Sequence, residues 1–375
     1  MANLEDYSRE ICETRRAIHR RPEEGWTEFE TTYRVVSTLE KYGVFKIKAG
    51  RDVIDPEHVL GRNPDLVEKA QKRALEHGVP QAFLDRLGGY TGAVAEFDTG
   101  RPGPAVGFRF DMDCVLVTES KDASHVPAAC GFASERDGFM HACGHDGHTA
   151  TGLGLAHWIA DHKDDLTGKI RLIFQPAEEG TRGASAMTAA GVADDLDWFF
   201  GAHVGCDCAP GEVGVVEKGF LATTKIDISF TGRASHAGSD PDKGRSALMA
   251  AAACALMMQG IPRHGEGDTR VAVGTLRAGE AVDMRASPEA ADLVATVVNA
   301  IPGLTSRMLQ GEGGSEDCSL LMRRAQQKGA KAVYFIYGCK HHGHHRSDFE
   351  IQDEKSLPVA FQVMTGIVTR LNGKA

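Results

Sequence analysis

Histidine, cysteine and acidic side chains gather at a few places in this sequence of 375 residues. The densest place is HACGHDGHTA at 141–150, which holds three histidines, a cysteine and an aspartate within ten positions. Thiolate, imidazole and carboxylate groups together suit zinc or manganese better than calcium or magnesium, which prefer oxygen ligands. The residue types therefore favour a transition-metal site. Further groups of this kind are Asp111 with Asp113, Glu178 with Glu179, His203, and the run KHHGHHR at 340–346.

The adjacent glutamates in PAEEG indicate what such a site would do. Two metal ions about 4 Å apart, joined by a bridging ligand, polarise a carbonyl group and acidify the water between them. One carboxylate of the pair Glu178 and Glu179 would then bind metal, while its neighbour faces the water as a general base. The pattern predicts metal-assisted hydrolysis.

Each cluster also has a simpler explanation. Cys143, with His145 and His148 nearby, is a candidate nucleophile, although a histidine two positions from the cysteine fits metal chelation better. A capped polar loop would explain CGHDGH, a solvated turn would explain PAEEG, and a core histidine would explain His203. The spacing does not match a zinc finger, which needs paired ligand arms. These explanations lose weight if the clusters share one location in the fold.

The order of predicted elements gives them such a location. From residue 105 onwards strands alternate with helices, which predicts an α/β fold with a mostly parallel sheet covered by helices. Each cluster follows a predicted strand, and ligands bind beyond the carboxyl ends of strands in open α/β sheets. We therefore expect the clusters to meet in one crevice. The predicted strands start at 105, 169, 197 and 330, and a helix is predicted over 149–162.

A segment of different texture interrupts this alternation. Short antiparallel strand patterns, GEVGVVEKGF among them, surround the alanine-rich helix predicted at 245–261, which indicates a smaller α+β domain. We therefore divide the chain into the first part of a catalytic domain at 1–212, an inserted domain at 213–283 and a return segment at 284–375.

Two helices are predicted before residue 100. One lies between Pro64 and Gly78, because Asn63 is a good N-cap, proline fits the first helical position and glycine suits the C-terminal end. The other opens the chain, with its apolar residues at helical spacing. These are Leu4, Tyr7, Ile11 and Ile18.

The composition restricts the class of partner. The formal net charge is −10, which argues against nucleic acid or an anionic membrane as the main partner. We see no run of roughly 20 apolar residues and no apolar signal core near the first residue. Nine cysteines at irregular intervals do not indicate a disulfide framework. We therefore expect a cytoplasmic protein.

Eight motifs, in the same order along nearly the whole chain, resemble the peptidase M20 family of metal-dependent amidohydrolases. Within that family the chain is similar to the subgroup of N-acyl amino acid and auxin-conjugate hydrolases. The motifs are RRAIHRRPEEGWTEFET, RFDMD, MHACGHDGHTA, IFQPAEEGTRGA, GAHVG, TGRASHAG, GGSED and GHHRSDFEIQDE.

The resemblance implies a role for each cluster. Glu178 would be the general acid and base, and His236 would reach from the inserted domain into a partner subunit's active site to steady the oxyanion. Asp113 and Asp146 would orient ligand imidazoles. Cys143 would bridge two divalent metal ions, manganese in preference to zinc. The implied ligands are Cys143, His145, Glu179, His203 and His344, with His345 as the alternative to His344.

The same resemblance implies a substrate and an assembly. The extra segment at about 50–90 is typical of members that split p-aminobenzoyl-glutamate, and N-acetyl, benzoyl or indole-acetyl amino acids are the alternatives. A homodimer, or a heterodimer with a related chain, is expected. The chain passes from GTLRAGE almost at once to the return segment, so about half of the inserted domain is missing relative to the family. Either the domain is short or a segment is omitted, and exposed apolar surface favours omission. A short lid would also suit a non-catalytic, metal-binding partner subunit.

Overall fold

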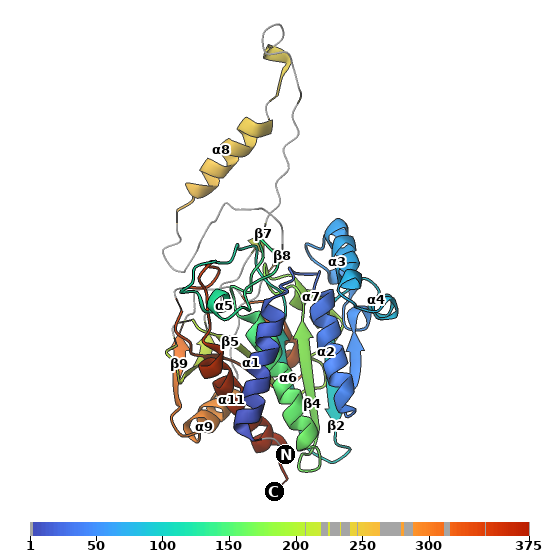
Figure 1. Cartoon of the computed structure of the whole chain (residues 1–375), viewed down its shortest axis with the longest axis vertical. Helices are drawn as coiled ribbons and strands as arrows, with labels where there is room; N and C mark the ends of the chain where they lie inside the picture. The colour runs from blue at the N-terminus through green and yellow to red at the C-terminus, as the bar shows by residue number, and fades with distance from the viewer. Residues whose placement is uncertain are drawn as a thin grey trace.

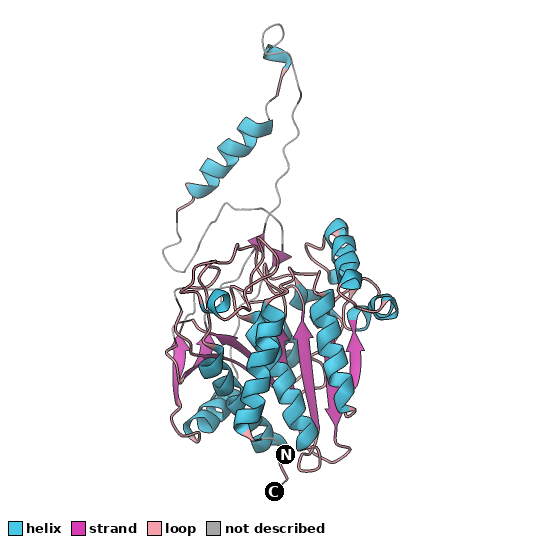
Figure 2. Cartoon of the chain, viewed as in Figure 1, coloured by secondary structure: helices cyan, strands magenta, loops and turns pink. Residues whose placement is uncertain are grey.

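The computed structural model describes residues 3–206, 208–218, 224–225, 233, 241–245, 247–262, 279–280, 288–310, 316–341 and 343–374. Within these ranges the main body is a sheet between layers of helices (Figures 1 and 2). None of the helices in this part of the chain is both long and apolar enough to cross a membrane.

One mixed, mostly parallel sheet of eight strands organises the body, in the order β1-β2-β4-β3-β5-β10-β6-β9. Its centre, β4-β3-β5-β10, is parallel throughout. The pairs β1-β2, β2-β4 and β10-β6 are antiparallel, and β6-β9 is parallel. The strands are β1 Lys46–Ala49, β2 Ala93–Asp98, β3 Ala105–Asp111, β4 Lys169–Gln175, β5 Trp198–Val204, β6 Glu212–Lys218, β9 Thr305–Gln310 and β10 Lys331–Tyr337.

Helices cover both faces of this sheet. On one face α6 (His145–Asp161) packs against β3 and against α1 (Leu4–His19), α2 (Phe29–Tyr42) and α11 (Asp353–Asn372), while α9 (Pro288–Asn299) packs against α11 and β10. On the other face α7 (Gly183–Ala189) and α10 (Cys318–Gln327) contact each other, β4 and β10. Strand β10 has alternate side chains in two separate buried clusters, as expected for a strand covered on both faces.

The predicted N-terminal helices are present. Helix α3 (Pro64–Glu76) begins as expected, with the Asn63 side chain accepting a hydrogen bond from the Asp65 backbone N–H. Gly78 follows its end with φ +91°, a backbone angle that favours glycine. In α1 the apolar face is buried except at Leu4, whose exposed fraction is 44% because it lies in the first turn.

The inserted segment differs from the expectation at its start. Strand β6, which we placed in the insert, pairs with β10 and β9 in the main sheet. Antiparallel pairing to β10 buries this strand in the main sheet. Its sequence pattern would suit a strand of a small domain equally well. Of the insert, the structure describes mainly α8 (Ala247–Gln259) and the two-stranded pair β7 (Thr224–Lys225) and β8 (Gly279–Glu280). The domain division itself stays a prediction.

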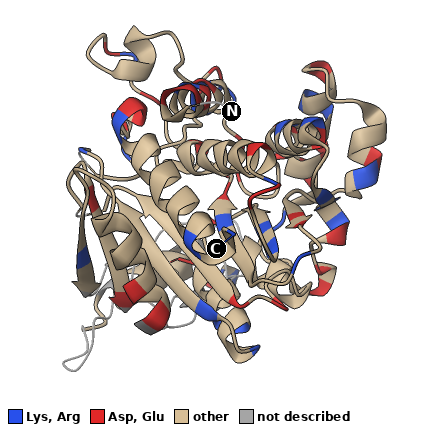
Figure 3. Cartoon of the chain, turned by 90° about the horizontal axis from the view of Figure 1, so that it is seen from below, with Lys and Arg blue, Asp and Glu red and all other residues tan. Residues whose placement is uncertain are grey.

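Charged residues of both signs are distributed over the outer helices in the view of Figure 3. Short elements complete the described chain. The short helices are α4 Gln81–Leu87, α5 Val126–Ala129 and the 3₁₀ turns Gly50–Asp52, Pro56–His58 and Pro241–Lys243.

Candidate metal centre

Four of the five predicted clusters lie at the carboxyl ends of four adjacent parallel strands. Asp111 ends β3, the glutamate pair follows β4, His203 lies near the end of β5, and the C-terminal histidines follow β10. These strands are neighbours in the order β4-β3-β5-β10. The crevice expected from the order of elements is therefore where the side chains gather.

Cys143 and His145 lie at the start of a helix, not after a strand as predicted. They do not follow a strand, because the chain after β3 forms a loop and α6 begins at His145. Gly144 is the N-cap of that helix, with φ +91°, and a Cβ atom there would lie 2.4 Å from Val204 Cγ1. Glycine thus lets the helix start against β5, and the first helical turn aims His145 at the strand ends.

Two sets of potential ligands share Cys143. Cys143, His145 and His203 form one set, and Cys143, Glu179 and His345 form the other, with the ligand atoms of each set within 4.8 Å of one another. Cys143 Sγ lies 3.4 Å from His203 Nε2. A thiolate common to two sets is the arrangement that a bridging ligand requires.

The C-terminal histidine of the second set is His345. Its Nε2 lies 3.1 Å from Glu179 Oε1. His344 instead groups with His203 and Cys206, and its Nε2 donates to the Val204 carbonyl at 3.1 Å. The alternative residue of our prediction, rather than the preferred one, therefore lies beside Glu179.

Asp113 holds both the glutamate pair and a histidine. Its two carboxylate oxygens accept hydrogen bonds from the backbone N–H groups of Glu178 and Glu179, at 3.0 and 2.9 Å. The same carboxylate lies 3.3 Å from His145 Nδ1. A carboxylate on the far nitrogen of a ligand imidazole fixes the tautomer and leaves Nε2 to face a metal.

Asp146 does not have its predicted role of orienting a ligand imidazole. Its Oδ2 accepts from Arg15 Nε and contacts His19 Nδ1, both at 2.7 Å, and it contacts no implied ligand imidazole among the described residues. Consecutive residues of a helix point about 100° apart, so Asp146 faces α1 while His145 faces the strand ends. The side chain ties α1 to the first turn of α6.

His148 has a structural role. Its Nδ1 lies 2.5 Å from Asp111 Oδ1, and its Nε2 accepts from the Val204 N–H at 3.0 Å. Since both ring nitrogens are engaged, this imidazole supports β5 beside His203. Arg109 donates to the other oxygen of Asp111 at 2.6 Å.

Burial and acidic neighbours raise the pKa of Glu178 and of the Cys143 thiol, so both groups retain their protons. Burial, and then the charges of Glu316 and Glu179, raise the pKa of Glu178 well above its usual range. Burial, and then the charges of Glu179 and Glu178, raise the pKa of the Cys143 thiol. Negative charge is therefore concentrated around the two residues that the chemistry needs most.

The pKa of the His145 imidazole is also raised by nearby carboxylates. Burial alone would lower the pKa of His145, but Asp111 and Asp113 outweigh it and raise that pKa to about 10. The protein alone thus holds protons where divalent cations would replace them.

A buried polar atom supports the fit of a metal. Among the described residues, His145 Nε2 has no hydrogen-bond partner. Buried polar atoms are otherwise almost always paired, and this nitrogen lies 4.0 Å from Glu179 Oε1, so the two atoms suit a cation between them.

His236, the predicted oxyanion residue, lies outside the described residues.

A buried group of charged residues near Glu178 was not part of the predicted site. Arg109, Glu316 and Asp317 form a buried ion-pair group in which Arg109 lies 3.0 Å from each of the two acids. The GGSED motif holds both acids, yet nothing in its spacing indicates that they lie behind Glu178. Burial, opposed by Arg109, raises the pKa of Asp317 to about 7.

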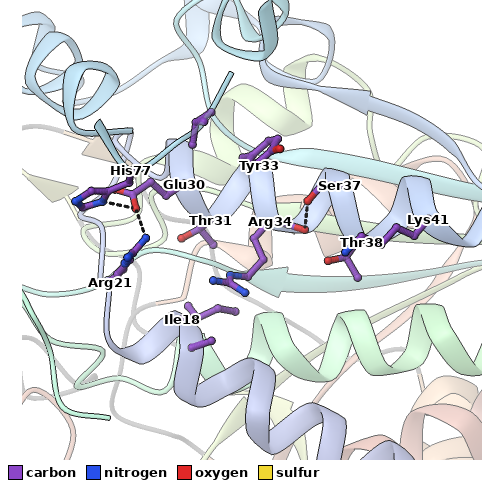
Figure 4. A pocket seen from close by; sticks show the side chains of 12 residues that line it. Ile18, Arg21, Glu30, Thr31, Tyr33, Arg34, Ser37, Thr38, Lys41 and His77 are labelled. Atoms are coloured by element: carbon purple, nitrogen blue, oxygen red, sulfur yellow. Dashed lines mark hydrogen bonds and ion pairs between the residues drawn. The ribbon is translucent and has the colours of Figure 1, made fainter. Parts of the chain in front are cut away.

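A separate hollow lies between α1, α2 and the residues that follow α3 (Figure 4), and its lining includes none of these residues. Its volume is about 260 Å³, and its lining contains none of the predicted site residues. Glu30, the acid in its wall, already contacts His77 Nδ1 at 2.8 Å and Arg21 at 3.7 Å. With its carboxylate paired and no thiol in the lining, this hollow does not resemble a hydrolytic centre.

Comparison with known families and curated proteins agrees with this geometry. Residues 107–370 match the model of peptidase family M20/M25/M40. A homolog of one of the p-aminobenzoyl-glutamate hydrolase chains, from Haemophilus influenzae, is 39% identical over 96% of this chain and 98% of that protein. The indole-3-acetyl-aspartic acid hydrolase of Enterobacter agglomerans is 37% identical, over 99% of this chain and 98% of that protein. The first alignment spans 416 positions, more than the 375 residues here, so the relative has residues without a counterpart in this chain.

A solved structure supports the same family and fold. The aminobenzoyl-glutamate utilization protein from Klebsiella pneumoniae superposes with a TM-score of 0.77 at 33% identity, covering 98% of each chain. With the layered sheet, the grouped ligands and these matches in hand, the chain belongs to peptidase family M20/M25/M40.

Proposed function

We propose that this chain is an amidohydrolase with two divalent metal ions, which splits the amide bond of an N-acyl amino acid. The observation that carries the proposal is the sharing of Cys143 between two ligand sets, one with His145 and His203 and one with Glu179 and His345. A shell of thiolate, imidazole and carboxylate accepts manganese or zinc, and the resemblance to the family makes manganese the preferred metal and zinc the alternative. When bound, the ions polarise the amide carbonyl and lower the pKa of water.

The protein's own contribution to the chemistry centres on Glu178. Its carboxylate takes a proton from the attacking water as the carbon–oxygen bond forms, and gives that proton to the nitrogen as the carbon–nitrogen bond breaks. Asp113 places this side chain by binding the backbone N–H groups of Glu178 and its neighbour Glu179. The pKa of Glu178, raised by burial and the nearby acids, suits a group that must both accept and return a proton.

The preferred substrate is p-aminobenzoyl-glutamate, giving p-aminobenzoate and glutamate. The two relatives named above carry different substrates in their names, yet both substrates join an aromatic acyl group to an acidic amino acid. The shared chemistry supports an aromatic acyl group and an acidic amino acid here, with indole-3-acetyl-aspartate as the second candidate and N-acetyl or benzoyl amino acids after it. His236, from the inserted domain, would steady the oxyanion.

The assembly is also a proposal. The name of the Haemophilus relative makes it the counterpart of one chain of an enzyme with more than one kind of chain. That name supports a heterodimer with a related chain, with a homodimer as the alternative. A cytoplasmic location remains our expectation.

A substrate panel tests the specificity. Purified protein, supplied with manganese, is assayed on p-aminobenzoyl-glutamate, indole-3-acetyl-aspartate and the N-acetyl and benzoyl forms of the same amino acids. The highest kcat/KM is expected for p-aminobenzoyl-glutamate. Equal kcat/KM for aliphatic and aromatic acyl groups would contradict the substrate assignment but leave the hydrolytic mechanism standing.

A further inference from the structure

A second group of potential ligands lies beside the proposed two-metal centre. His203, Cys206 and His344 each offer a ligand atom, and these atoms lie within 4.8 Å of one another. His203 is near the end of β5, and Cys206 lies two residues beyond the last residue of that strand. His344 lies in the loop after β10, which pairs with β5 along its length. Neither Cys206 nor His344 has a role in the hydrolytic mechanism.

The two imidazoles are held in defined orientations. The Val204 carbonyl accepts from His203 Nδ1 at 2.7 Å and from His344 Nε2 at 3.1 Å. Each ring therefore keeps one nitrogen with a lone pair, Nε2 in His203 and Nδ1 in His344. Holding one ring nitrogen on a backbone carbonyl is how proteins prepare the other for a metal.

His341 fastens together the two loops that carry this group. Its Nδ1 accepts from the Gly343 N–H at 3.0 Å, so its Nε2 donates to the Cys206 carbonyl at 3.2 Å. The close approach requires Gly205, which has φ +84° and whose added Cβ would lie 2.8 Å from His341 Nε2. The loops are thus connected independently of any ion.

The chemistry of this group differs from that of the two-metal centre. It contains a thiol and two imidazoles but no carboxylate. Thiolate and imidazole ligands select zinc, whereas manganese prefers sites with oxygen ligands. Three protein ligands leave a fourth position for water, as in many zinc sites.

We propose that His203, Cys206 and His344 form an accessory site for a thiophilic divalent ion, zinc above all, and that its occupation inhibits the hydrolytic centre. His203 is common to both sites, and its Nε2 lies 3.4 Å from Cys143 Sγ. One lone pair cannot serve two ions, so an ion held by Cys206 and His344 draws His203 away from Cys143. The inhibition rests on the proposed function, whereas the binding of zinc does not.

The test measures zinc bound per chain in the purified full-length protein. Protein carrying its first two equivalents receives a small excess of zinc, is freed of unbound metal, and is analysed for metal content and activity. The variants are Cys206→Ser and, independently, His344→Ala. Cys130→Ser is the matched control, because Cys130 is exposed and belongs to neither ligand group.

Wild-type protein and Cys130→Ser are expected to retain a third equivalent of zinc and to lose activity at least about tenfold as it binds. Cys206→Ser and His344→Ala should retain one equivalent fewer and resist inhibition. A third equivalent that persists in both variants, or that is absent from wild type, would overturn the accessory site. If every chain holds fewer than two strongly bound ions and none is active, the proposed function fails, while the difference of one equivalent between wild type and Cys206→Ser still decides this inference.

Discussion

Asp113 is the side chain on which most of the proposed centre depends. It holds the backbone of Glu178 and Glu179 and lies beside His145 Nδ1, so one carboxylate orients a base, a ligand carboxylate and a ligand imidazole. Nothing in the motif RFDMD separates it from Asp111, which instead holds His148 and Arg109. Asp111 ends β3 and Asp113 lies two residues beyond it, so two nearby aspartates hold different groups of the site.

Replacing Glu178 with Gln should abolish turnover while metal remains bound. The amide cannot take a proton from water, so kcat is expected to fall about 10²–10⁴-fold, the usual contribution of a general base. Metal content per chain, measured alongside kcat, should not change. Glu57→Gln, at an exposed glutamate, is the control and should behave as wild type. Turnover of the Glu178 variant near the wild-type rate would contradict the assigned role.

Replacing Asp113 with Asn should weaken metal binding. Loss of the carboxylate beside His145 Nδ1 removes the group that fixes its tautomer, and such changes cost about 10- to 100-fold in metal affinity. The dissociation constant for manganese, from competition with a chelator, gives the measurement. An unchanged constant would mean that Asp113 serves only the backbone of the glutamate pair.

Metal affinity should rise with pH. In the protein alone, burial and the neighbouring glutamates raise the pKa of the Cys143 thiol, and Asp111 and Asp113 raise that of His145 to about 10. Both groups therefore carry protons at neutral pH, and metal binding must release them. Affinity should increase about tenfold per pH unit for each proton released between about pH 6.5 and 8.5. Calorimetry in two buffers of different ionisation enthalpy counts the protons, and a flat pH dependence would refute the argument.

Helix α6 is the element that brings the main motif to the strand ends. Its N-terminus starts at His145, and the buried Asp146 in its first turn is clamped to α1 by Arg15 and His19. Arg15 also contacts Glu350 and Asp353 near the start of α11. The three helices are thus joined by charges buried directly behind the candidate ligands.

Replacing Arg15 with Leu should destabilise the protein strongly. The change leaves buried carboxylates without their cation, which costs about 3–5 kcal/mol of unfolding free energy. Arg9→Ala on the same helix is the control, because its pair with Asp6 is exposed and such pairs contribute at most about 1 kcal/mol. Chemical denaturation compares the two variants. An equal, small loss in both would show that the buried cluster does not hold α1 to α6.

Sequence patterns predicted these elements unevenly. The caps around α3 and the runs of β3, β4, β5 and β10 are local signals, and all of them are confirmed. The start of α6 at His145 was not predicted, because residues 145–148 are polar or glycine and carry no apolar helical spacing, so the helix was predicted only from residue 149. The choice between His344 and His345 also lies beyond spacing, since it depends on the positive φ of 59° at His345 that turns the backbone there. Strand β6 lies between β10 and β9 in the sheet, and only the tertiary structure supplies these two partners.

The molecule as a whole combines a complete helix-covered sheet with an insert of which the structure describes little. The family and the class of reaction followed from motifs spread over the chain, and the family match over 107–370 and the hydrolase relatives confirm them. The mostly parallel sheet followed from the alternation of strands and helices, and the observed strand order confirms it. We expect substrate choice to depend on the inserted segment, which carries the predicted His236 and lies largely outside the described residues. The residues at the strand ends therefore support the class of reaction more than they support one substrate.

The metal content of the purified chain tests the central claim most directly. Wild-type protein should carry two divalent ions per chain together with hydrolytic activity on p-aminobenzoyl-glutamate, and exhaustive chelation should abolish that activity until manganese is restored. Cys143→Ser should bind both ions more weakly, because its side chain is common to the two ligand sets. Full activity with no bound metal would contradict the two-metal account and make Cys143 the nucleophile instead.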